Sequence, residues 1–178
     1  MRKLFIAVIL LSVIGTLFAQ APAANVSAVQ FPSADKVAGK KILFAYEESN
    51  EKLDPWLARF NSAFSAANLT ADKKAATDLA SADFSKYDLI VVYGAVMAFT
   101  AKEPLRDWLT KESGLSGKKV ALFVTANRWF LKKYDDQLLS LLKQKNASVV
   151  DAVSGATKDL SESEKRKMVG DFVEKLGK

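Results

Sequence analysis

The chain has 178 residues and a formal net charge of +6, and it contains neither cysteine nor histidine. These two absences exclude disulfides, cysteine nucleophiles, Ser-His-Asp triads, zinc sites built on His or Cys, and haem held by either residue. The basic residues are dispersed except at positions 165–167, which Glu162 and Glu164 precede. A mixed run of this kind is typical of a solvated helix face, so we predict no nucleic-acid partner.

The first 23 residues have the layout of a secretory signal peptide. A short basic start precedes an apolar stretch at 4–18, and small residues follow at 19–23. An uncleaved anchor is the alternative, but about 15 apolar residues fall short of the roughly 20 that span a bilayer. The absence of cysteine excludes a lipoprotein. We therefore predict an exported protein, periplasmic or extracellular, without a stable membrane span, cleaved at a position that the pattern leaves open.

Behind the signal peptide, residues 24–38 lack sustained periodicity and are expected to form a linker to one domain at 39–178. In that domain, residues 89–93 and 120–124 are continuous apolar runs rather than alternating ones. Continuous runs favour parallel strands that helices cover on both faces. Three further strands are expected, at 41–46, at 147–153 and, as a charged edge strand, within 69–79.

The segments between these strands carry helix signals. Asp54 is the expected N-cap of the first helix, with Pro55 at its first helical position. The motif Thr-x-x-Glu at 100–103 has the spacing of a capping box, and Ser-x-x-Glu at 161–164 repeats it before the last helix. The stretch 80–86 is too short for a full crossover helix. Strands that alternate with helices in this way predict an α/β fold with right-handed crossovers.

Three segments carry a family resemblance: Tyr-Asp-Leu-Ile-Val-Val-Tyr-Gly-Ala at 87–95, Pro-Leu-Arg-Asp-Trp-Leu at 104–109 and Leu-Ser-Gly-Lys-Lys-Val-Ala-Leu-Phe-Val at 115–124. In order and spacing they resemble the flavodoxin family, most of all the short flavodoxin domains related to menaquinone-dependent protoporphyrinogen oxidase. The resemblance implies a flavodoxin-like three-layer α/β sandwich with a five-stranded parallel sheet in the order 2-1-3-4-5. It also implies non-covalent binding of flavin mononucleotide (FMN) for electron transfer, with a redox partner protein or a quinone as the partner.

In this family the FMN phosphate binds the loop after the first strand, through backbone amides and hydroxyls at a helix start. The matching stretch, residues 47–52, reads Glu-Glu-Ser-Asn-Glu-Lys. The resemblance assigns Ser49 and Asn50 as phosphate donors, but the usual glycine is missing and three carboxylates surround them. At roughly 5 Å and an effective dielectric near 20, each like-charge contact costs on the order of 3 kcal/mol. We therefore predict a degenerate phosphate loop.

The resemblance places the flavin ring between the loops that follow the third and fourth strands, residues 94–100 and 125–130. The cofactor contacts that it implies there are Ala95, Phe99, Thr125, Asn127 and Trp129. The two aromatic residues stand where stacking rings are found. Each has a simpler alternative, because aromatic residues also cover helix ends and asparagine is a common turn residue. Arg128 can meet an anionic ligand or pair with a glutamate of the first loop.

The sequence leaves two other functions open. A cofactor-free flavodoxin-like binding or structural module of the cell envelope is the main alternative, and the acidic loop favours it. A flavin-dependent quinone reductase or oxidase is the third, although no insertion for a substrate is visible. The carboxylates of Glu47, Glu48 and Glu51 can also hold a divalent cation. Solvated surface charge is the commoner arrangement, so no metal ligand is assigned, and no catalytic residue.

Overall fold

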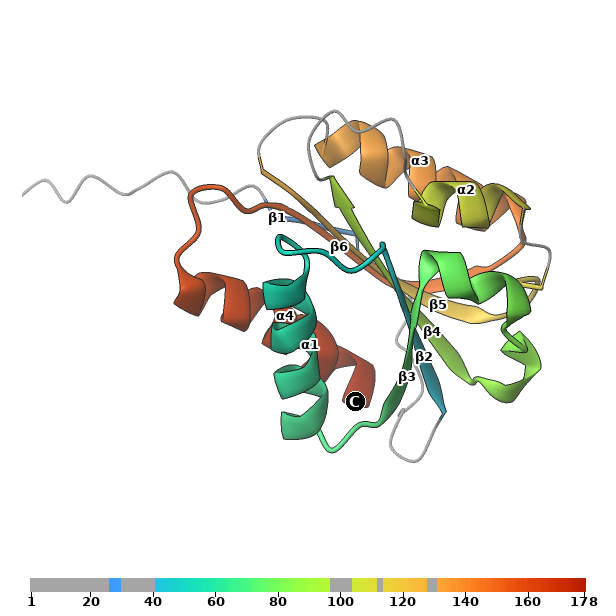
Figure 1. The fold of residues 1–178 in the computed structure, drawn as a ribbon, viewed down its shortest axis with the longest axis horizontal. Helices are drawn as coiled ribbons and strands as arrows, with labels where there is room; N and C mark the ends of the chain where they lie inside the picture. The colour runs from blue at the N-terminus through green and yellow to red at the C-terminus, as the bar shows by residue number, and fades with distance from the viewer. Residues whose placement is uncertain (1–25, 30–40, 97–103, 112–113, 128–130) are drawn as a thin grey trace, which may run out of the picture.

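The computed structural model describes residues 26–29, 41–96, 104–111, 114–127 and 131–178. The strands lie in one six-stranded sheet with the order β1-β6-β5-β4-β2-β3 (Figure 1). Their bounds are Val26–Val29 for β1, Ile42–Tyr46 for β2, Ala71–Ala75 for β3, Leu89–Val96 for β4, Lys119–Ala126 for β5 and Ser148–Ala156 for β6.

The five strands from β2 to β6 run parallel to one another, as strands buried on both faces usually do. Taken in chain order they lie as 2-1-3-4-5, which confirms the predicted sheet. The sixth strand, β1, pairs antiparallel with β6, with Val26 opposite Gly155. It lies within residues 24–38, the segment expected to be a linker. Part of that segment therefore extends the sheet beyond the predicted five strands.

Helices cover both faces of the sheet (Figure 1). Two of them pack on one face and two on the other, which gives the three layers that the resemblance implies. The first pair is α1 (Asp54–Ala66) and α4 (Glu162–Gly177), and the second is α2 (Pro104–Lys111) and α3 (Leu131–Gln144). Among the described residues, no helix is long and apolar enough to cross a membrane.

Two short 3-10 helices join β3 to β4, namely η1 (Ala76–Ser81) and η2 (Phe84–Lys86). The prediction that residues 80–86 are too short for a crossover helix is therefore confirmed. Both pieces still bury an apolar side chain against the α2/α3 face, Leu79 from η1 and Phe84 from η2. They cover the part of the sheet where a full helix would otherwise lie.

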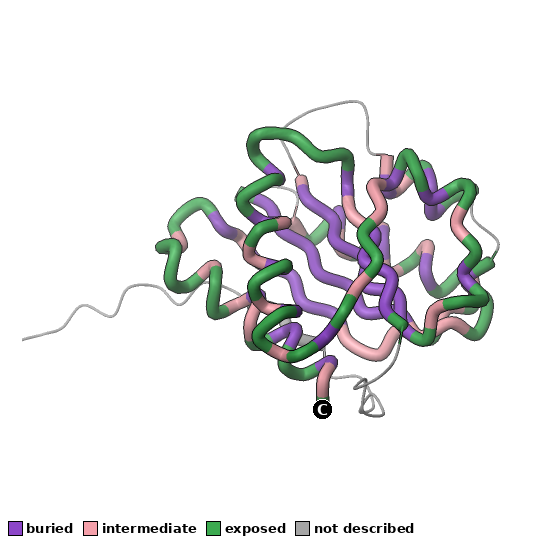
Figure 2. The backbone as a smooth tube through the Cα atoms, turned by 60° about the horizontal axis from the view of Figure 1, so that its bottom comes forward, coloured by how far each residue is buried: buried purple, intermediate pink, exposed green. Residues whose placement is uncertain are grey.

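Side chains alternate along the central strands and divide the core between the two faces. Along β2, Ile42 and Phe44 pack beneath α1 and α4, whereas Leu43 and Ala45 pack beneath α2 and α3. The side-chain period of two in a strand fixes this division. Figure 2 shows the result, with buried strands between helices whose exposed residues face outward. The same alternation decides toward which face Glu47, the residue that follows β2, directs its side chain.

Helix α1 begins at Asp54, and Leu53 is its N-cap residue. The prediction of Asp54 as N-cap and Pro55 as first helical residue was therefore wrong by one position. The side chain of Leu53 makes no capping hydrogen bond. Instead, the backbone carbonyl of Asn50 accepts hydrogen bonds from the N–H groups of Leu53 and Asp54, both at 2.9 Å. A turn before the helix thus satisfies donors that a capping side chain usually takes. The motif at 100–103 lies outside the described residues.

Helix α4 begins with the capping box that the sequence predicts. The Ser161 hydroxyl accepts from the Glu164 backbone N–H at 3.3 Å, and the Glu164 carboxylate accepts from the Ser161 N–H at 2.7 Å. We expect Ser161→Ala to lower the free energy of unfolding by about 1 kcal/mol, because one N-terminal donor loses its acceptor. Urea unfolding measures this change. Ser163→Ala, at an exposed position of the same turn, is the control, and an equal loss in both variants would contradict the capping role.

Candidate functional site

The carboxyl ends of β2, β4 and β5 meet at one edge of the sheet, which is where open parallel sheets bind ligands. Ala95 on β4 lies opposite Thr125 on β5 in the strand register. The structure therefore brings these two predicted contacts together as neighbours on adjacent strands. The two aromatic residues predicted to contact the flavin ring, Phe99 and Trp129, lie outside the described residues, as does Arg128.

The loop between β2 and α1 is closed by the side chain of Asn50. Its carboxamide oxygen accepts from the backbone N–H groups of Lys52, at 3.0 Å, and Leu53, at 3.1 Å. Its carboxamide nitrogen donates to the Glu48 carbonyl oxygen at 3.0 Å. The backbone carbonyl of Asn50 accepts hydrogen bonds from the N–H groups of Leu53 and Asp54, as described above. Three backbone donors at the start of α1, those of Lys52, Leu53 and Asp54, are thus already bonded within the chain rather than open to an anion.

Ser49, the second predicted phosphate donor, is also engaged within the loop. Its hydroxyl donates to the Asp54 carboxylate at 2.5 Å, at the start of α1. The side chains of Ser49 and Asn50 are therefore both bonded within the chain, and their predicted role as phosphate donors stays a prediction. Glu48 and Glu51 are exposed in the same loop. Three exposed carboxylates, those of Glu48, Glu51 and Asp54, thus lie in this loop or at the helix start that follows it.

Unlike Glu48 and Glu51, which are exposed, Glu47 is buried, with 6% of its surface exposed. The alternation along β2 directs it to the α2/α3 face, where one carboxylate oxygen accepts from the Leu105 backbone N–H at 3.2 Å. The other accepts a short hydrogen bond from the Tyr134 hydroxyl of α3. Leu105 lies in the first turn of α2, where unpaired N–H groups and the helix dipole favour a carboxylate.

The partners of Glu47 were missed in the sequence analysis, which grouped the residue with Glu48 and Glu51 as one acidic cluster. The period of two along β2 was the available signal, since residues 43, 45 and 47 must share a face. Within the described part of the chain, no group of three or more potential ligands is placed to hold a metal ion. The divalent-cation hypothesis for these three glutamates therefore finds no geometric support.

Thr125 is buried, and its hydroxyl lies 3.0 Å from the Tyr93 hydroxyl in a buried hydrogen bond. Burial raises the pKa of Tyr93, although the hydrogen bond with Thr125 and the charge of Arg59 oppose the shift. Tyr93 is therefore a neutral hydroxyl at physiological pH. Asn127 is exposed, and its backbone carbonyl accepts from the Lys158 N–H at 3.1 Å. Its side chain remains at the surface of the loop after β5.

Sequence comparisons find no relatives, whereas comparisons of structure find many. No protein-family model matches the chain, and no curated protein does. The flavodoxin of Streptococcus pneumoniae TIGR4 superposes with a TM-score of 0.56 at 14% identity, over 76% of this chain and 97% of that one. Flavodoxin 2 of Bacillus cereus gives 0.55 at 19% identity, over 76% and 97%. The Fusobacterium nucleatum flavodoxin bound to FMN gives 0.54 at 10% identity, over 75% and 95%.

These similarities establish that the fold is flavodoxin-like. At such low identity the likeness concerns the fold alone, so it transfers no residue roles. The finer resemblance to domains related to menaquinone-dependent protoporphyrinogen oxidase stays a prediction. In this chain the loop after β2 is held by its own hydrogen bonds and carries the exposed carboxylates of Glu48 and Glu51.

The hydrogen bond between Tyr134 and Glu47 is testable by removing one hydroxyl group. We expect Tyr134→Phe to lower the free energy of unfolding by about 2 kcal/mol, because a buried carboxylate loses a donor. Chemical denaturation measures the loss. Tyr87→Phe is the matched control, because the Tyr87 hydroxyl donates to Asp72 at 3.0 Å in an exposed pair. We expect that variant to lose less than about 0.5 kcal/mol. Equal losses would show that Glu47 does not depend on Tyr134.

Proposed function

We propose that this protein is exported, binds FMN non-covalently at the carboxyl edge of the sheet, and transfers electrons to or from a redox partner protein or a quinone. The observation that carries the proposal is the flavodoxin-like fold, in which β2, β4 and β5 end together at that edge. One protein of this fold, the F. nucleatum flavodoxin, is bound to FMN. A bound flavin supplies the redox chemistry, and the protein orients its ring and controls its contact with water.

The phosphate of FMN does not fit the loop after β2 in the way that the resemblance implies. Asn50 already accepts from the loop amides, and Glu48 and Glu51 add like charge beside them. The ring therefore contributes most of the binding in this proposal, through the segments that carry Phe99 and Trp129, and the phosphate contributes little. The degenerate phosphate loop that the acidic sequence predicts is thus part of the proposed function.

A cofactor-free binding or structural module of the cell envelope is the second candidate, and the environment of Glu47 favours it. Its buried carboxylate joins β2 to α2 and α3 right where the phosphate loop begins. These two hydrogen bonds join the carboxyl edge of the sheet to α2 and α3, so the edge is stable without a ligand. In that case the flavodoxin-like fold serves as a scaffold, and function resides in its surface.

A comparison of FMN with riboflavin isolates the contribution of the phosphate, because the two ligands share the ring. For the mature wild-type protein we expect dissociation constants that agree within about threefold, which corresponds to less than about 1 kcal/mol. Titration followed by flavin fluorescence measures both. FMN binding a hundredfold tighter than riboflavin would contradict the proposed loop. Absence of binding by either flavin would favour the cofactor-free module.

Removing the loop carboxylates should restore part of the phosphate contribution. We expect Glu48→Thr combined with Glu51→Gly to tighten FMN by about three- to tenfold, because two exposed like charges disappear, and to leave riboflavin nearly unchanged. The control combines Asp171→Asn with Glu174→Gln, which removes two exposed carboxylates of α4. An equal gain in the control would assign the effect to net charge rather than to the loop.

Export rests on the basic and apolar start of the chain. We expect the mature protein to begin between Gln20 and Ala24 and to occur outside the cytoplasm. N-terminal sequencing of the protein from fractionated native cells measures both. A protein that still begins at Met1 and stays in the cytoplasmic fraction would contradict export, and would leave the flavin proposal to be judged by the titrations alone.

A further inference from the structure

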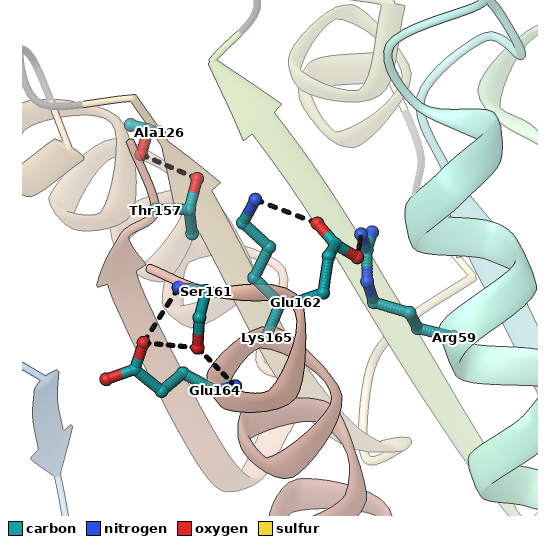
Figure 3. A network of polar contacts seen from close by, with 7 residues as sticks. All are labelled: Arg59, Ala126, Thr157, Ser161, Glu162, Glu164 and Lys165. Carbon is teal, nitrogen blue, oxygen red and sulfur yellow. Dashed lines mark hydrogen bonds and ion pairs between the residues drawn. The ribbon is translucent and has the colours of Figure 1, made fainter. Parts of the chain in front are cut away.

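Arg59 reaches from α1 across to the first turn of α4, on the face of the sheet away from Glu47. Its guanidinium carbon lies 4.8 Å from the centre of the Trp56 ring, which places the charge over the indole. One guanidinium nitrogen, Nη2, is paired with the Glu162 carboxylate. Glu162 also accepts from the Lys165 ammonium at 3.1 Å. Figure 3 shows the two cations approaching this one carboxylate from opposite sides.

The guanidinium of Arg59 is only partly satisfied. Its side chain is 10% exposed, and within the described structure its Nε and Nη1 atoms are buried without a hydrogen-bond partner. Buried donors of a charged group are costly to leave unpaired, on the order of 1–3 kcal/mol each. The donors therefore point to an acceptor that the described part of the chain does not supply.

Arg59 of α1 meets Glu162 and Lys165 of α4 at a place that we call the seam between the two helices. The charges at this seam favour an anion. Arg59 and Lys165 share a single carboxylate, and that carboxylate is 61% exposed, so it screens them incompletely. Hydrogen bonds from Arg59 and then from Lys165 lower the pKa of Glu162, so it is ionised at neutral pH. The N-terminus of the 16-residue helix α4 adds partial positive charge beside them.

The surroundings hold this seam in place. Thr157, just before α4, donates its hydroxyl to the Ala126 carbonyl at the end of β5, at 3.2 Å (Figure 3). The capping box at Ser161 then fixes the first turn of α4. On the other side, the charge of Arg59 acts on the buried Tyr93 hydroxyl. The two cations therefore project from two anchored helices rather than from free loops.

We propose that the seam between α1 and α4 is a binding site for a phosphate-like oxyanion, in which Arg59 and Lys165 bind the anion and the Glu162 carboxylate occupies the site when the anion is absent. The tetrahedral oxygens of a phosphate accept from the guanidinium and from the ammonium at once. Free phosphate and a phosphate monoester share this chemistry. The site lies on a different face from Glu47 and does not depend on the proposed flavin site.

The test is a titration of the full mature protein with inorganic phosphate, in chloride buffer at constant ionic strength. Heteronuclear NMR follows the backbone amides of residues 161–165. We expect saturable shifts there in the wild type, and about tenfold tighter binding in Glu162→Gln, because the competing carboxylate loses its charge. Lys165→Met should weaken binding in a folded protein, as should Arg59→Lys. Glycerol phosphate, titrated in parallel, distinguishes a monoester from free phosphate as the preferred ligand.

The matched control is Glu174→Gln, which removes an equally exposed carboxylate of the same helix that pairs with Lys178 at 2.6 Å. It should bind phosphate as the wild type does. The proposal is overturned if neither phosphate nor glycerol phosphate shifts residues 161–165, or if Glu162→Gln binds no tighter than the wild type. It is also overturned if the control gains as much affinity as Glu162→Gln does. Flavin binding or its absence changes none of these results.

Discussion

The buried carboxylate of Glu47 is the constraint on which the candidate site depends. A buried charge that loses its partners costs about 3–5 kcal/mol, so it must find donors wherever it points. Alternation along β2 turns it toward the α2/α3 face, where Leu105 and Tyr134 supply them. These bonds hold the first turn of α2 and the helix α3 against the end of β2. They add to the apolar packing of Leu105, Leu109 and Leu138, which seats the same two helices on the sheet.

The turn that follows has to carry the chain from the end of β2 to α1 on the opposite face. Asn50 organises it by accepting, through two oxygens, the N–H groups of Lys52, Leu53 and Asp54. In a phosphate loop, backbone N–H groups of this kind donate hydrogen bonds to the bound anion. Here the side chain and the backbone carbonyl of one uncharged residue accept from them, and the exposed Glu48 and Glu51 lie on either side of it in the sequence. These bonds stabilise the loop in the free protein, and in our proposal they and the two carboxylates disfavour the phosphate.

The range of each interaction explains what could be predicted from the sequence. The apolar runs at 89–93 and 120–124 and the capping box at 161–164 are local patterns, and they predicted the sheet and the start of α4 correctly. The short strand β1 has no periodicity to reveal it, and only its pairing with β6 defines it. The donors to Glu47 lie 58 and 87 residues away, and Glu162 lies 103 residues from Arg59. Contacts of that kind depend on the folded topology.

We propose that a flavin binds at the carboxyl edge of this sheet without its phosphate entering the loop after β2. The most direct measurement is the heteronuclear NMR spectrum of the mature protein during titration with FMN, read at the backbone amides of Lys52, Leu53 and Asp54. We expect saturable shifts near Ala95 and Asn127, beside the ring loops, and none at these three amides, because Asn50 keeps them bonded. Large shifts at the three amides that saturate together with FMN binding would contradict this proposal.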